Sequence, residues 1–315
     1  MPALNSARFG RRGFLQAALA GAGAVVGARL SGQPAFAARP IVRRGGAHMK
    51  LSLAAYSFHK LLPYERKAAD FKDAPMVLED VIHFAADQNL DGVELTSYYF
   101  PTDLDSKYLF HLKDLTFRLG LDISGTAIRN DFCLPAGEAR KADLAHTRRW
   151  IDYAAEMGAP VIRIFAGSVP KGDSEAAAIE RCIDGINESL TYAAQKGVFL
   201  ALENHGGITA TPEQMLMIVH GVKDSPWFGV NFDSGNFATA DPYADLEKSV
   251  PYAINVQVKV EMSPGGKKGP ADLARVVRIL KEAKYRGYVV LEYEADADPL
   301  EAVPTHLKKL RELIS

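Results

Sequence analysis

The chain has 315 residues, of which 48% are hydrophobic and 24% charged, a composition typical of a globular protein with one large domain or two small ones. Its 37 basic residues are balanced by 38 acidic ones, so the formal net charge is −1. Proteins that bind DNA or RNA carry a basic surface, and this balance therefore argues against a nucleic-acid partner.

The first 38 residues have the features of an export signal. The pair Arg11-Arg12 precedes an apolar stretch rich in small residues over residues 17–30, and Ala35-Phe36-Ala37 follows as a small-x-small cleavage site. The apolar stretch is too short to span a bilayer comfortably. We therefore expect residues 1–38 to be a twin-arginine signal, recognised by the twin-arginine export machinery and cut near Ala37. The mature protein would then lie in the periplasm or outside the cell without a stable membrane anchor. An uncleaved anchor and a start at Met49 are the alternatives.

From Leu51 onward, short apolar segments alternate with longer segments of helical periodicity, which indicates βα units and a parallel sheet. Eight strands are predicted, over residues 51–57, 92–95, 121–128, 161–165, 199–205, 228–233, 254–259 and 288–292. Helical periodicity follows each strand, over apolar positions within residues 78–85, 112–119, 139–157, 179–190, 212–220, 243–250, 273–280 and 303–313. We predict a linker over residues 39–50 and a single (β/α)8 TIM barrel over residues 51–315. The glycine-rich turn over residues 264–269 is expected to be a solvated loop.

Four successive strands in the second half of this barrel end in polar side chains. Their apolar runs stop at Glu203, Asp233, Gln257 and Glu292. In a TIM barrel the chemistry collects where the strands end, at the C-terminal face, so we expect these side chains to converge. Alternate residues of a strand share a face, so Asn231 should point inward with Asp233.

The converging side chains predict a metal site. Burying charge without a partner is costly, so three carboxylates at one place are hard to explain without a cation. A divalent ion together with Lys259 would roughly balance the charges of Glu203, Asp233 and Glu292. Carboxylate and amide oxygens favour Mn²⁺ or Mg²⁺ over Zn²⁺. We therefore predict one divalent metal ion bound by these three carboxylates and Gln257.

Other polar residues of the C-terminal face are candidates for substrate contacts. His205 lies two residues beyond Glu203 on the same strand face. Lys259 lies two residues beyond Gln257 on the same strand face, near the place where negative charge would develop on a substrate. Arg163 lies on the strand over residues 161–165, and the sequence does not fix whether it points inward. Glu94, on the strand over residues 92–95, is expected to be structural.

A barrel with these strand-end residues resembles the xylose isomerase-like superfamily, often called sugar phosphate isomerase/epimerase, which includes the D-tagatose and D-psicose 3-epimerases. The resemblance implies that Glu, Asp, His and Glu at the ends of strands five to eight hold one divalent metal. These positions are occupied here by Glu203, Asp233, Gln257 and Glu292. Gln257 departs from the family's histidine and is similar to the pattern of 3-dehydroshikimate dehydratases. Asn236 stands where the epimerases often have a substrate-binding histidine.

The resemblance also implies the chemistry, which is proton abstraction next to a carbonyl group through a metal-stabilised enediolate. Glu203 and Glu292 are expected to be the acid/base pair, with Asp233 and Gln257 as structural ligands. The leading expectation is a metal-dependent isomerase or epimerase of an unphosphorylated carbohydrate, and its relatives imply a homo-oligomer. A lyase or hydratase acting on a keto-sugar, 3-keto-glycoside or 3-dehydroshikimate-like substrate would use the same site. A non-catalytic periplasmic sugar-binding barrel is the third alternative.

Overall fold

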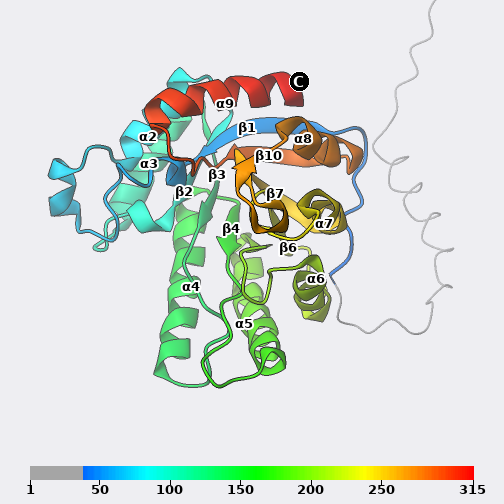
Figure 1. The fold of residues 1–315 in the computed structure, drawn as a ribbon. Helices are drawn as coiled ribbons and strands as arrows, with labels where there is room; N and C mark the ends of the chain where they lie inside the picture. Colours follow the sequence, from blue (N-terminus) through cyan, green and yellow to red (C-terminus); the bar gives the residue numbers. More distant parts are fainter. Residues whose placement is uncertain (1–37) are drawn as a thin grey trace, which may run out of the picture. The chain divides into compact units, whose positions relative to one another are not determined.

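The computed structural model describes residues 38–315, so the predicted signal peptide lies outside the described residues except for Ala38. Eight parallel strands close into a barrel in the order β1-β10-β7-β6-β5-β4-β3-β2 (Figure 1). The barrel strands are β1 (His48–Ala54), β2 (Gly92–Thr96), β3 (Asp122–Ala127), β4 (Val161–Ile164), β5 (Phe199–Glu203), β6 (Phe228–Asp233), β7 (Ala253–Val258) and β10 (Arg286–Leu291). The predicted single TIM barrel is confirmed.

Helices follow the strands and pack around the barrel. They are α2 (Leu78–Asp87), α3 (Ser106–Arg118), α4 (Glu138–Met157), α5 (Glu175–Lys196), α6 (Pro212–Gly221), α7 (Pro242–Ser249), α8 (Leu273–Glu282) and α9 (Pro299–Ile314). Short 3-10 turns complete the described fold, at η1 (Ala55–Phe58), η2 (Ala68–Asp73), η3 (Ser97–Tyr99), η4 (Val250–Tyr252) and η5 (Pro264–Gly266). The two longest helices, α4 and α5, run side by side in Figure 1. In the described part of the chain, no helix combines the length and apolar character needed to cross a bilayer.

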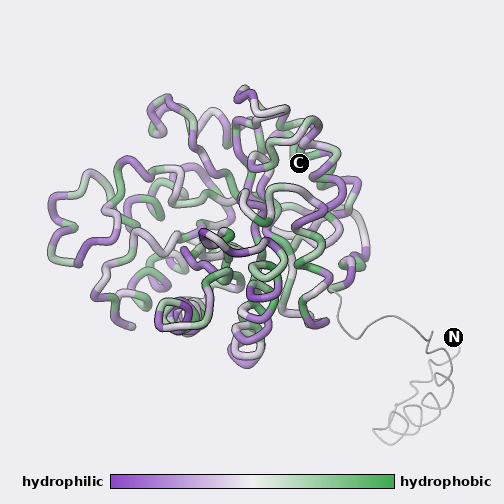
Figure 2. The backbone as a smooth tube through the Cα atoms, turned by 60° about the horizontal axis from the view of Figure 1, so that its bottom comes forward, coloured by the Kyte–Doolittle hydropathy of each residue, from purple (hydrophilic) through white to green (hydrophobic). Residues whose placement is uncertain are grey.

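Local sequence signals explain where the helices begin and end. Helix α6 starts with a capping box, in which the Thr211 hydroxyl accepts from the backbone N–H of Gln214 and the Gln214 side chain accepts from the backbone N–H of Thr211. Helix α5 ends at Gly197, whose φ of 72° is a left-handed conformation that favours glycine. Helix α8 buries Leu273 and Leu280 against the barrel, whereas Arg278 is exposed. Figure 2 shows the resulting mixture of hydrophilic and hydrophobic residues along the helical stretches.

Several strand bounds differ from the prediction by one to three residues, and two differences change the description of the fold. Strand β1 begins at His48, three residues before the predicted start, because the backbone from His48 onward pairs with β10 from Arg286 onward. The glycine-rich turn is not a plain loop, since β8 (Glu261–Met262) pairs antiparallel with β9 (Gly269–Pro270) around η5. The rest of the predicted linker lies along the N-terminal face of the barrel, where the backbone N–H of Ile41 donates to the carbonyl of Pro251 over 2.9 Å.

Candidate active site

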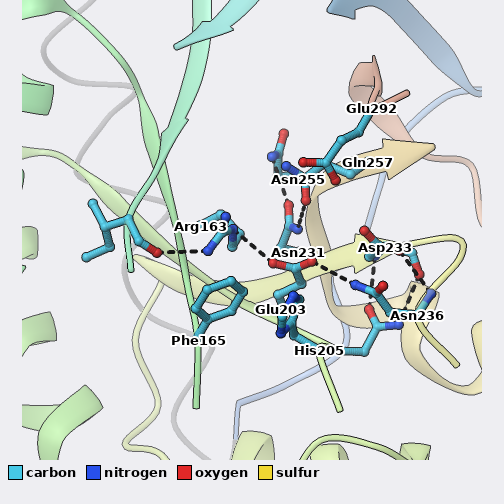
Figure 3. Close-up of polar contacts among 12 residues, drawn as sticks. Arg163, Phe165, Glu203, His205, Asn231, Asp233, Asn236, Asn255, Gln257 and Glu292 are labelled. Atoms are coloured by element: carbon cyan, nitrogen blue, oxygen red, sulfur yellow. Dashed lines mark hydrogen bonds and ion pairs between the residues drawn. The ribbon is translucent and has the colours of Figure 1, made fainter. Parts of the chain in front are cut away.

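The four predicted strand-end residues lie together at the C-terminal face of the barrel. Glu203 and Asp233 end β5 and β6, Gln257 lies near the end of β7, and Glu292 directly follows β10. All four are buried, with at most 5% of their surface exposed. The predicted strand parity is confirmed, since Asn231 points inward and donates to the Gln257 side chain (Figure 3).

Glu203 is held between a cation and an amide. The Arg163 Nε atom lies 2.9 Å from Glu203 Oε2 as an ion pair, and the Asn236 side-chain amide donates to Glu203 Oε1 over 2.9 Å. Arg163 also donates to the carbonyl of Ile128 over 2.8 Å and to the hydroxyl of Tyr98 over 3.2 Å. These contacts show that Arg163 points into the barrel. Because these donor groups are engaged within the protein, Arg163 is placed to position Glu203, and its contact with a substrate stays a prediction.

Burial sets the electrostatics of this ion pair. It raises the pKa of the Glu203 carboxyl well above its usual range, although the charge of Arg163 opposes the rise. Burial lowers the pKa of Arg163, but Glu203, Tyr98 and Glu292 together outweigh burial and leave that pKa above its ordinary value. The Arg163 guanidinium also lies 3.9 Å from the centroid of the Phe165 ring, which adds a cation–π contact.

A second cation, the Lys259 ammonium, lies among three other carboxylates. Its Nζ atom is 3.4 Å from Asp233, 3.1 Å from Glu292 and 2.8 Å from Glu294. Burial opposes the charge of Lys259, but the three carboxylates outweigh burial and raise its pKa well above the ordinary value. Burial raises the pKa of Asp233 to about 7 against the opposing charge of Lys259. Sequence reasoning missed Glu294, which lies two residues past the end of the predicted strand.

The side chain of Gln257 belongs to a closed ring of hydrogen bonds inside the barrel. Its amide donates to Glu94 over 2.6 Å, and its carbonyl oxygen accepts from Asn231 over 2.6 Å. Asn255 closes the ring by donating to Asn231 over 2.9 Å and to Glu94 over 3.0 Å. Burial raises the pKa of Glu94 to about 7. In the sequence, the sign of this role of Glu94 is that a carboxylate stands inside an otherwise apolar strand.

The remaining predicted contacts lie at the mouth of the barrel. His205 stacks on Phe165, with ring centroids 4.1 Å apart, while part of its surface stays exposed. Partial burial and then the charge of Arg163 lower the pKa of His205 to about 4, so its imidazole is neutral at physiological pH. Two cavities open here, one of about 200 Å³ lined by Asn236 and Lys259 and one of about 500 Å³ lined by Phe165 and His205.

The four predicted metal ligands contact other protein groups in this structure. Among residues 38–315, no three His, Cys, Asp or Glu side chains are arranged so that they could hold a metal ion. Glu203 faces Arg163, Asp233 and Glu292 share the Lys259 ammonium, and both amide atoms of Gln257 are used in the ring. In this arrangement the four groups face the protein's own cations and amides, and their role as metal ligands stays a prediction. The divalent ion itself stays a prediction.

Comparisons with known proteins agree with this barrel. A family model described as "Xylose isomerase-like TIM barrel" matches residues 82–313. No curated protein matches the sequence. Similar solved structures include D-psicose 3-epimerase with D-tagatose from Clostridium cellulolyticum H10, with 16% identity, coverage of 85% of this chain and 100% of that chain, and a TM-score of 0.68.

Two further solved structures are similar to this barrel over most of its length. The 3-keto-D-glucoside 4-epimerase of E. coli has 17% identity, coverage of 84% of this chain and 100% of that chain, and a TM-score of 0.62. A xylose isomerase-like TIM barrel protein from Mycobacterium smegmatis, in complex with magnesium, has 18% identity, coverage of 84% and 96%, and a TM-score of 0.66. At these identities the likeness shows the shared fold alone.

Proposed function

The chain belongs to the xylose isomerase-like TIM barrel family, as its strand-end residues predicted, and on that premise we propose that it is a sugar isomerase or epimerase. The observation that carries the proposal is the pair of buried carboxylates, Glu203 and Glu292, held by cationic side chains where two barrel strands end. Two of the similar structures are epimerases of carbohydrates, which supports the same substrate class here.

In the proposed reaction, one carboxylate removes a proton from the carbon next to the substrate's carbonyl group. The other returns a proton, either to the opposite face of that carbon or to the neighbouring carbon. A carboxylate whose pKa is raised toward neutrality is a stronger base, and burial raises the pKa of Glu203 in this direction. Asn236 holds one oxygen of Glu203, which fixes the orientation of the carboxylate.

Negative charge develops on the carbonyl oxygen during this transfer, and a fixed positive charge nearby stabilises it. Lys259 lines the cavity beside Asn236, where it contacts Glu292. The twin-arginine signal predicted for residues 1–38 supports a substrate outside the cytoplasm, where phosphorylated sugars are scarce. We therefore propose an unphosphorylated carbohydrate as the substrate.

The proposal is tested by incubating the protein in D₂O with free ketoses, aldoses, 3-keto-glycosides and 3-dehydroshikimate, and by following the products by NMR and mass spectrometry. We expect deuterium next to a carbonyl group and no other change in mass. Glu203→Gln and Glu292→Gln should each slow this exchange by roughly 10²- to 10⁴-fold. Glu213→Gln is the matched control, because that side chain is 69% exposed and its ion pair with Lys248 lies at the surface.

The other outcomes are also informative. Loss of water or of an aglycone would replace the isomerase with a lyase that uses the same carboxylates. Saturable sugar binding without any exchange would contradict catalysis and leave a sugar-binding barrel.

A further inference from the structure

We propose that the ammonium group of Lys259 is the resident cation of this site, occupying the place among the carboxylates that the sequence assigns to a divalent metal. Its Nζ atom lies within 3.4 Å of carboxylate oxygens from Asp233, Glu292 and Glu294. The proposal deepens the proposed function, on which its catalytic consequence rests. The predicted Mn²⁺ or Mg²⁺ ion is the competing occupant.

The turn after β6 is shaped to hold this lysine. The Ser234 hydroxyl accepts a hydrogen bond from the Lys259 backbone N–H over 2.9 Å. Gly235 packs directly on the lysine side chain, since a Cβ atom built there would lie 2.9 Å from Lys259 Cβ and 3.0 Å from Lys259 Cδ. Asp233, the preceding residue of the same segment, faces the ammonium with Oδ2. Three consecutive residues therefore accommodate the lysine from its backbone to its charged end.

Charge repulsion opposes a divalent ion at the same place. Like charges a few ångströms apart in a buried site repel strongly, so a divalent ion next to the carboxylates would have to displace the ammonium. The lysine is 8% exposed, and leaving its partners would cost it three ionic contacts. Removing one partner from a buried group of charges is strongly destabilising.

Gln257, which occupies the neighbouring predicted ligand position, is already hydrogen-bonded to other side chains. The carbonyl oxygen of Gln257 accepts from the Asn231 amide and the Gln257 amide donates to Glu94, so turning this side chain toward an ion would break both hydrogen bonds. Buried polar groups left without partners cost stability. Gln257 and Lys259 lie on the same face of one strand. This gives a reason for the glutamine at the strand-seven ligand position. Gln257 completes the hydrogen-bond ring, and Lys259, two residues further on, carries the positive charge next to the carboxylates.

The lysine is placed to act on a substrate. It lines the cavity of about 200 Å³ together with Asn236 and Glu294. An ammonium group there donates a hydrogen bond to a carbonyl oxygen and stabilises the charge that develops on it, which is the role that positively charged groups play in such reactions. The site therefore works without a bound divalent ion.

The test measures metal binding and thermal stability without any substrate. The purified protein is treated with EDTA, dialysed and titrated with Mn²⁺, while the free ion is followed by its EPR signal and melting is followed by circular dichroism. Wild type should bind no stoichiometric Mn²⁺ and melt unchanged. Lys259→Met, which keeps the length of the stem, should melt about 10 °C lower, and Mn²⁺ should bind it at about one equivalent and restore its melting temperature.

Lys141→Met is the matched control, because that side chain is 74% exposed and pairs with Glu138 on helix α4, far from the site in the sequence, and it should change neither reading. One equivalent of Mn²⁺ bound by wild type and lost in Asp233→Asn would overturn the proposal, and it can be measured even if Lys259→Met does not fold. A folded Lys259→Met that melts as wild type and ignores Mn²⁺ would also overturn it. Failure of the exchange reaction would leave these readings untouched, so the two proposals fail separately.

Discussion

Replacing Arg163 by methionine should destabilise the protein by about 3–5 kcal/mol, which is the usual cost of breaking a buried ion pair by removing one partner. The side chains of Arg163 and Glu203 are only 5% and 3% exposed, so water cannot replace the lost charge. Within residues 38–315, Glu203 Oε2 has no hydrogen-bond partner besides this ion pair, and the variant would leave it uncompensated. The carbonyl of Ile128 and the hydroxyl of Tyr98 would lose their donors as well.

The assay is urea unfolding followed by circular dichroism for wild type, Arg163→Met, Glu203→Gln and the double variant. Because Glu203→Gln removes the charge that Arg163→Met would leave unpaired, the double variant should lose less than the sum of the single losses, by about 2 kcal/mol. A loss below about 1 kcal/mol for Arg163→Met, or additive losses in the cycle, would refute the reasoning. Arg163 would then contribute nothing to holding Glu203.

Three further predictions concern the barrel and the framework of the site. The pKa of Glu94 is raised from 4.5 to about 7 in the folded state, so its contribution to the free energy of unfolding is fully present below pH 4.5 and is lost as the pH rises through about 7. That loss is roughly 3 kcal/mol, and urea unfolding of Glu94→Gln should lack it. In the core, Leu280→Ala should cost about 2–5 kcal/mol in thermal unfolding, whereas Met217→Ala, at a position 58% exposed, should change stability by less than about 0.5 kcal/mol. Gly235→Ala should push the Lys259 stem out of place, lowering the melting temperature and the rate of deuterium exchange, and a normal rate would show that this packing does not matter.

The fold could be predicted because each strand is an apolar run bounded by turn residues, and because glycines mark helix ends such as Gly158 and Gly197. The start of β1 was predicted three residues too late, because the polar residues His48 and Lys50 are not typical of a buried strand. They lie at the N-terminal edge of the barrel, where Lys50 pairs with Asp122 at the surface.

The site was only partly predictable from the strand ends. Parity placed Asn231 and Gln257 inward, but sequence alone could not show that Asn231 donates to Gln257 and that Gln257 donates to Glu94, on the far side of the barrel. The direction of Arg163 was open, because β4 is four residues long and all of them are buried. Several buried carboxylates require nearby positive charge, but the sequence does not show whether a metal ion or the Lys259 ammonium supplies it.

Proton transfer by Glu203 and Glu292, in a site whose proposed cation is the Lys259 ammonium, should not need a metal ion. The most direct test is the rate of deuterium incorporation into the best sugar of the panel before and after exhaustive removal of metal with EDTA. We predict the same rate within about twofold, with strong loss in Glu203→Gln and Glu292→Gln. Exchange that stops on chelation and returns only with added Mn²⁺ or Mg²⁺ would contradict the account.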